Sequence, residues 1–241
     1  MGDGWARLGF WAAAATVLLS AVSFAIAFAT PPRSGPNCTF DTCVAAPYTD
    51  IEAYFPRDYL WMFPATLVPF AFLVMVACIH YVAAEGRKPL TLTAVALTAM
   101  SAAIISTDYF IQLTVVQPSV LRGELDGLSF WSQYNPHGVF IALEAIGYSM
   151  MVASLLFVAP VFAGRGLERA LRWLFVLAPA TALAALVGLY AAYGDDVEYR
   201  FEVAVISIAW TALIVGGVLL SIFFRRIARQ PSTRETTSGS G

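Results

Sequence analysis

The chain has 241 residues, of which 59% are hydrophobic and 12% are charged, and its mean hydropathy is +0.71. A soluble domain carries about twice that share of charged residues, so the composition argues against a soluble fold. The net charge of −2 also argues against a basic surface that would attract nucleic acid, and we expect no nucleic-acid partner.

Six apolar runs are long enough to cross a membrane, because about 20 helical residues span the hydrocarbon core. The alternation of apolar and polar residues expected of barrel strands is not present in these runs. The sequence therefore predicts an all-α integral membrane protein, a six-helix bundle in one domain over residues 1–229. The runs are Leu8–Ala29, Tyr59–Ala83, Leu90–Val116, Pro136–Ala163, Leu171–Tyr193 and Phe201–Phe224.

The two ends of the chain carry separate predictions. The first run could be a signal peptide, but its roughly 22 residues exceed the usual core of about 7–15, so we expect a retained helix. The final segment, residues 230–241, reads "QPSTRETTSGSG" and is polar without apolar periodicity. It is predicted to be a disordered tail.

Basic residues are distributed unevenly between the two sides of the predicted bundle. With a cytoplasmic N-terminus, the inner segments hold ten of the 14 Lys and Arg residues, and the outer loops hold only Arg33, Arg57, Arg122 and Arg200. This bias predicts that both termini are cytoplasmic and that the protein spans the plasma (inner) membrane several times.

The first outer loop contains Cys38 and Cys43 in the segment "NCTFDTC". A disulfide persists in an oxidising compartment, so we expect these cysteines to form a structural bond. A catalytic redox pair is the alternative. It would need a second reactive pair nearby, and the remaining cysteine, Cys78, lies at the inner end of the second run.

The outer loop between the third and fourth runs contains "PSVLRGELDG". Pro118 suits the first turn of a helix and Gly127 suits its end, so a short amphipathic helix is predicted here. Its apolar side chains would lie on the membrane surface or cover the bundle as a lid.

The fourth run opens with the segment "SQYNPHGVFIALEAIGY". Asn135 is a favourable N-cap and Pro136 a favourable first helical residue, so the fourth helix is predicted to start there. From that start His137, Glu144 and Tyr148 fall at i, i+7 and i+11, which places all three on one face.

The third run carries a matching acid. Asp108 and Gln112 are four residues apart, and Asp108 lies eight residues before Val116 just as Glu144 lies eight after Pro136. Both acids are therefore about 12 Å inside the membrane on consecutive helices. A charged Asp at that depth costs ~3 kcal/mol, and no Lys or Arg lies deep in any run. At least one of the two carboxyls is therefore expected to keep its proton.

These residues predict a polar pocket in the outer half of the bilayer. The alternative is that they only tie two helices together, but such bonds average about 0.6 kcal/mol, so buried acids are a costly way to obtain them. The candidate catalytic residues are Asp108, Glu144 and His137, and the candidate ligand-binding residues are Gln112, Gln133, Tyr148, Ser207 and Trp210.

No cofactor or metal is expected. The two histidines, His80 and His137, lie at opposite membrane faces, which excludes a bis-histidine haem within one chain. The one lysine, Lys88, lies in an inner loop, so a retinal Schiff base within a helix is excluded. His137, Glu144 and Asp108 are the one candidate zinc set, and their spacing matches no common motif.

The expected partners are membrane lipids and a lipophilic small molecule. The pocket would bind or transform such a molecule by proton transfer. Two other functions are left open by the sequence: a proton-linked transporter, and a non-enzymatic accessory or sensor protein.

Overall fold

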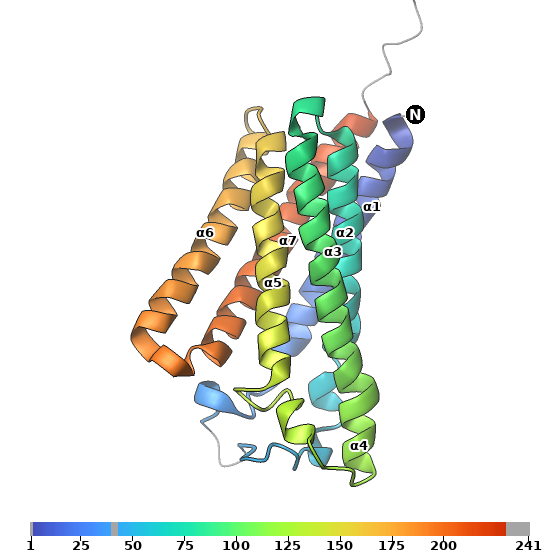
Figure 1. Cartoon of the computed structure of the whole chain (residues 1–241). Helices are drawn as coiled ribbons and strands as arrows, with labels where there is room; N and C mark the ends of the chain where they lie inside the picture. Colours follow the sequence, from blue (N-terminus) through green and yellow to red (C-terminus); the bar gives the residue numbers. More distant parts are fainter. Residues whose placement is uncertain (1, 40–42, 230–241) are drawn as a thin grey trace, which may run out of the picture.

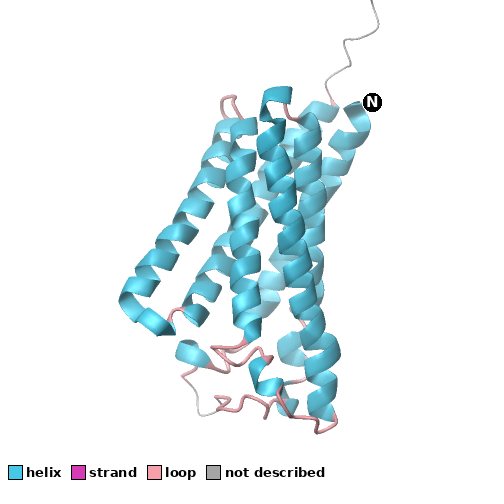
Figure 2. Cartoon of the chain, viewed as in Figure 1, coloured by secondary structure: helices cyan, strands magenta, loops and turns pink. Residues whose placement is uncertain are grey.

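A computed structural model describes residues 2–39 and 43–229, and this part of the chain consists of helices and loops (Figures 1 and 2). Six helices are long and apolar enough to cross a membrane, which confirms the prediction of an all-helical, six-span protein. The predicted tail, residues 230–241, lies outside the described residues. The six helices are α1 (Gly2–Ala29), α2 (Met62–Val82), α3 (Lys88–Ile111), α5 (Val139–Val158), α6 (Leu167–Tyr193) and α7 (Glu198–Ala228).

The helices form one bundle in which α1 packs against α2 and α7, and α5 packs against α3, α6 and α7. Figure 1 shows the start of α1 and the end of α7 at the same end of the bundle. The connections 30–61, 122–138 and 194–197 lie at the opposite end, which we call the loop end. Helix α6 leans away from α5 toward the loop end, and none of its buried residues, Leu171, Phe175, Ala178 and Ala182, lies in the last third of the helix.

The third helix is longer than predicted. It continues from α3 through a π-helical turn, Gln112–Val116, into α4, Gln117–Leu121. The predicted loop helix over 118–127 is not confirmed over that range, because α4 ends at Leu121 and the backbone turns at Gly123 and Gly127, whose φ angles are 73° and 75°.

The fourth membrane helix, α5, begins at Val139, so the prediction of a start at Pro136 is wrong. Asn135 forms a tight turn instead of an N-cap. Its side-chain oxygen accepts the His137 N–H at 3.1 Å, and its backbone oxygen accepts the Gly138 N–H at 2.9 Å. Gly138 then has an extended backbone immediately before the first helical residue.

Glycines bring the helices that build the site into close contact. A Cβ atom on Gly147 of α5 would lie 2.6 Å from Ile105 of α3, and the Ser101 hydroxyl donates to the Gly147 carbonyl at 2.8 Å. A Cβ atom on Gly217 of α7 would lie 2.6 Å from Val17 of α1. Small residues are the usual means of close helix approach in membranes, where lipid provides no hydrophobic drive for association.

Candidate functional site

Three acids from three helices meet in the half of the bundle nearer the loop end. Asp108 of α3, Glu144 of α5 and Glu202 of α7 form this acid cluster, and their exposed fractions are 1%, 1% and 6%. The charges of the three carboxyls are close enough to interact with one another. The close approach of α3 and α5 at Gly147, one helical turn from Glu144, explains why the first two acids meet.

A chain of hydrogen bonds ends on Glu144. The Tyr109 hydroxyl donates to Glu144 Oε1 and lies 2.9 Å from the Tyr148 hydroxyl. The Trp210 Nε1–H donates to the Tyr148 oxygen at 3.1 Å. Because the Tyr109 proton is used on Glu144, the Tyr148 hydroxyl must donate to Tyr109. All three donors therefore point in one direction, toward the carboxyl group of Glu144.

The carboxyl groups of Glu144 and Glu202 lie close enough to each other for a hydrogen bond. Such a bond requires a proton on one of the two groups, because an ionised carboxylate can only accept. Neither oxygen of Asp108 has a hydrogen-bond partner among the described residues, and the same is true of Glu202 Oε2. A proton shared by Glu144 and Glu202 would make that bond, and the unsatisfied oxygens leave the cluster with hydrogen-bonding capacity.

A cavity of about 450 Å³ lies beside the acid cluster, between α1 on one side and α5 and α7 on the other. We call it the α1–α7 cavity. Glu144 and Glu202 supply its acidic wall. Its lining includes the aromatic side chains Phe24, Phe28, Trp61, Phe140, Tyr199 and Trp210, and the apolar residues Ala27, Val203 and Ile206.

The loop end closes the cavity with an ion pair. Arg33 Nε donates to Asp58 Oδ2 at 3.0 Å, and the Arg33 guanidinium lies 4.3 Å from the centre of the Tyr54 ring. The Tyr134 hydroxyl reaches the same carboxylate oxygen at 3.5 Å. Burial raises the pKa of the Tyr134 hydroxyl above its ordinary value, so this group stays a donor.

Several predicted site residues do meet at this cavity. Glu144, Gln133, Ser207 and Trp210 line it. Tyr148 is fully buried and contacts Trp210 through the hydrogen bond described above. The Ser207 hydroxyl donates to the Val203 carbonyl of its own helix at 2.7 Å, so this residue contributes mainly a small side chain.

Asp108 and Gln112, like Tyr148, do not line the cavity. Asp108 belongs to the acid cluster. Gln112 is buried at the π-helical turn, where its Nε2 donates to the Trp131 carbonyl at 2.6 Å. Its contact therefore fastens the third helix to the loop end.

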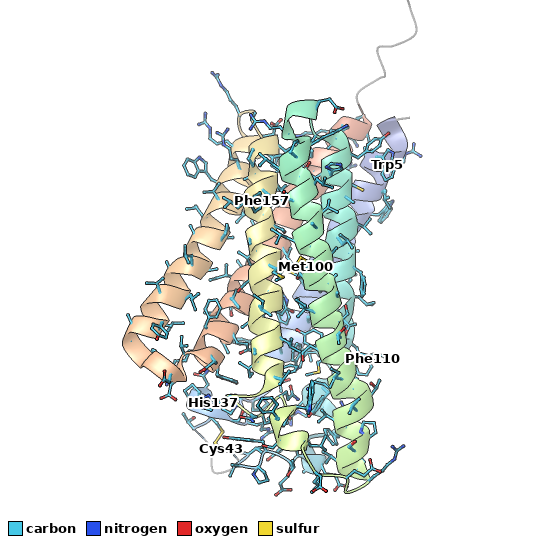
Figure 3. All side chains as sticks on the ribbon, viewed as in Figure 1. Trp5, Cys43, Met100, Phe110, His137 and Phe157 are labelled. Carbon is cyan, nitrogen blue, oxygen red and sulfur yellow. A yellow bond between two sulfur atoms is a disulfide. The ribbon has the colours of Figure 1, made fainter. Side chains whose placement is uncertain are left out.

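The prediction that His137 shares a helix face with Glu144 and Tyr148 is wrong. This residue precedes α5 instead of lying on it, so it does not share a face with Glu144 and Tyr148. Its side chain is 60% exposed, and Nδ1 lies 3.6 Å from Glu198 Oε2. Figure 3 shows His137 among the loops, beyond the end of α5. His137 does not line the α1–α7 cavity.

Two residues of the site were missed by reasoning from the sequence. Glu202 was assigned to the boundary of the last run, but α7 begins at Glu198, which puts Glu202 in its second turn. A usable signal was present, because Glu202, Ala209 and Gly216 are spaced by heptads and all are buried. Tyr109 was overlooked beside Asp108, although a hydroxyl next to an intramembrane acid is a natural partner for a second acid.

The predicted disulfide between Cys38 and Cys43 is confirmed. In the described ranges, no group of three His, Cys, Asp or Glu side chains has a spacing that could hold a metal ion. Comparison with protein-family models, with curated proteins and with solved structures found no match to this chain.

Proposed function

We propose that this membrane protein binds a lipid-soluble small molecule in the α1–α7 cavity and exchanges a proton with it through Glu144 and Glu202. The observation that carries the proposal is the position of two neighbouring carboxyls in the wall of a largely apolar cavity. Intramembrane acids are costly and commonly mark functional sites. A cavity of this size lies within the usual range of small-molecule sites, which is about 300–1,000 Å³.

The chemistry follows from the hydrogen bonds. The protonated carboxyl of the Glu144–Glu202 pair would transfer its proton to the bound molecule, so its O–H bond breaks and a bond from hydrogen to the molecule forms. The carboxylate that remains would be stabilised by the hydroxyl that Tyr109 donates to Glu144. Tyr148 and Trp210 orient that hydroxyl, since each donates toward Glu144 along the chain.

The bound molecule would enter from the side of the bundle. Phe28 of α1 is 87% exposed and Val203 of α7 is 39% exposed, and both also line the cavity. Exposed apolar residues on two neighbouring membrane helices face hydrocarbon in a bilayer. A lipid-soluble molecule would therefore reach the acidic wall without crossing the loop end, where Arg33 and Asp58 are paired.

The proposal includes an orientation in the plasma membrane, with both termini cytoplasmic. The excess of Lys and Arg in the segments on the same side as the two termini supports this orientation. The disulfide between Cys38 and Cys43 lies at the loop end, and a disulfide persists on the oxidising side of a membrane. The α1–α7 cavity would then lie in the outer half of the bilayer.

Native mass spectrometry of the full-length protein, released gently from its membrane, tests the proposal. We expect a discrete co-purifying molecule with the wild type and with the control Glu124→Gln, which changes an exposed loop carboxyl. Glu144→Gln should reduce that occupancy at least tenfold while the melting temperature stays within a few degrees. Wild-type protein without any bound molecule, or equal occupancy in the wild type and Glu144→Gln, would contradict the proposal and favour proton-linked transport.

A further inference from the structure

The electrostatics of the α1–α7 cavity restrict the kind of head group it can accept. Of the described residues that line the cavity, one, Arg33, is basic. Its guanidinium is already occupied by the Asp58 carboxylate at 3.0 Å and by the Tyr54 ring at 4.3 Å. The acids Glu144 and Glu202 therefore face the cavity without a cation of the protein to balance them. An anionic head group would be repelled there.

The Glu202 carboxyl lines the cavity and carries an unsatisfied oxygen atom. Glu202 Oε2 is buried and has no hydrogen-bond partner in the part of the chain that the structure describes. A buried acceptor without a donor costs about 1–3 kcal/mol. A bound molecule that donates a hydrogen bond to this atom would remove that cost, whereas a purely apolar molecule would not.

The walls next to the acids present aromatic rings. Trp210 packs edge-to-face against Phe24 with ring centres 5.6 Å apart, and against Trp61 at 6.2 Å. Trp210 and Tyr148 also pack edge-to-face. Indole and phenyl faces attract cations, most strongly where water is excluded. Aromatic rings beside two carboxyls form an environment that stabilises a positive charge.

We infer that the lipid-soluble molecule is an amine, whose apolar body lies between α1 and α7 and whose nitrogen binds the Glu202 carboxyl. The inference rests on the proposed function and gives the chemical class of its ligand. The neutral amine would leave the bilayer and take the proton held by the Glu144–Glu202 pair, so one carboxyl O–H bond breaks and one N–H bond forms. The products are an ammonium and a carboxylate in direct contact.

An ion pair formed in this way avoids carrying a charge across hydrocarbon. The amine enters neutral and the carboxyl starts protonated, so both charges appear only where Tyr109 and the aromatic rings can stabilise them. A quaternary ammonium, which is always charged, would have to enter with its charge exposed to lipid. The cavity is therefore expected to prefer a tertiary amine to a permanently charged analogue.

Matched probes of one shape test the inference. The probes are N,N-dimethyl-4-phenylbutylamine, its carbon isostere (5-methylhexyl)benzene, in which CH replaces nitrogen, and 5-phenylpentanoic acid. The readout is the shift in melting temperature of the full-length protein in detergent as each probe is titrated, because a ligand that binds only the folded state stabilises it. The variants are Glu202→Gln and the control Glu124→Gln, each melted first without probe to establish that it is folded.

We expect the amine to reach its half-maximal shift at a concentration at least tenfold lower than the isostere, with no shift from the acid. Glu202→Gln should abolish the difference between amine and isostere, and Glu124→Gln should preserve it. Equal shifts by amine and isostere, or the largest shift by the acid, would overturn the amine inference while the proposed cavity still stands. If none of the probes shifts the wild type, both the inference and the proposed function fail. The comparison of probes on wild-type protein does not depend on how any variant folds.

Discussion

Asp108 and Tyr109 are neighbours on α3 but differ in whether their polar atoms have hydrogen-bond partners. Tyr109 is fully buried and contacts both Glu144 and Tyr148 through its hydroxyl. Asp108 is equally buried, but its carboxyl oxygens have no hydrogen-bond partner among the described residues. Tyr109 therefore stabilises the folded state, whereas Asp108 costs free energy unless a proton or a bound molecule satisfies it.

Tyr109→Phe should lower the free energy of unfolding by about 1–3 kcal/mol, because it leaves Glu144 without its donor and Tyr148 without its acceptor. The measurement is unfolding by sodium dodecyl sulfate in mixed micelles. Tyr190→Phe is the matched control, since Tyr190 is 61% exposed on α6 and should have no measurable effect. Equal stability of both variants would show that the hydrogen-bond chain contributes nothing to folding.

Asp108→Asn should leave the free energy of unfolding within about 0.5 kcal/mol of the wild type, or raise it, since no hydrogen bond to the described protein is lost. The same mixed-micelle titration measures it. If Asp108 served only to tie α3 to α5, the substitution would cost stability in proportion to the bond it removed. A loss above about 1 kcal/mol would therefore favour the structural alternative and weaken the functional one.

At the scale of helices, the site depends on where pairs of helices touch and where they separate. Helices α1 and α7 are in close contact at Gly217, where an added Cβ would lie 2.6 Å from Val17 and 3.2 Å from the Ala13 carbonyl. Nearer the loop end the same two helices line opposite sides of the α1–α7 cavity. At the cavity the two helices remain in contact through larger side chains, since Phe24 of α1 packs edge-to-face on Trp210 of α7 with ring centres 5.6 Å apart.

Gly217→Ala is expected to destabilise the protein by about 1–3 kcal/mol, because neither the β-branched Val17 nor the backbone at Ala13 can move aside without repacking. Gly188→Ala on α6 is the control. A Cβ at Gly188 meets nothing within 4 Å, and alanine has the higher helix propensity, so stability should be unchanged or slightly higher. Thermal unfolding of the two variants in parallel decides the matter, and equal losses would refute the role given to the α1–α7 contact.

Helix positions were more predictable from the sequence than helix contacts. Length and hydropathy located all six spans, because membrane insertion depends on local composition. The pairing of Asp108 with Glu144 was also accessible, since consecutive antiparallel helices are neighbours. The start of α5 could not be predicted, because Asn135 is equally suited to a tight turn and to a helix N-cap, and the turn is the one that forms.

For the molecule as a whole, the part of the site contributed by α7 required the structure. Glu202 reaches Glu144 only because α7 packs against α1, α5 and α6, and that arrangement depends on glycines and ring packing spread over the chain. The sequence indicated an acidic pocket near one face of the membrane. It could not show that the pocket lies beside a cavity between the first and last helices, or that His137 is excluded from it.

The most direct test of a lipid-accessible acidic cavity is photolabelling of the full-length protein in lipid nanodiscs with an alkyl diazirine, followed by peptide mapping. Saturable labelling is predicted on the cavity-lining parts of α1 and α7, with Glu202 among the labelled residues, and excess unlabelled alkane should remove it. Leu183 and Val187, exposed on α6 away from the cavity, should show only labelling that does not saturate. Labelling that is equally strong on α6 and absent from Glu202 would contradict the account.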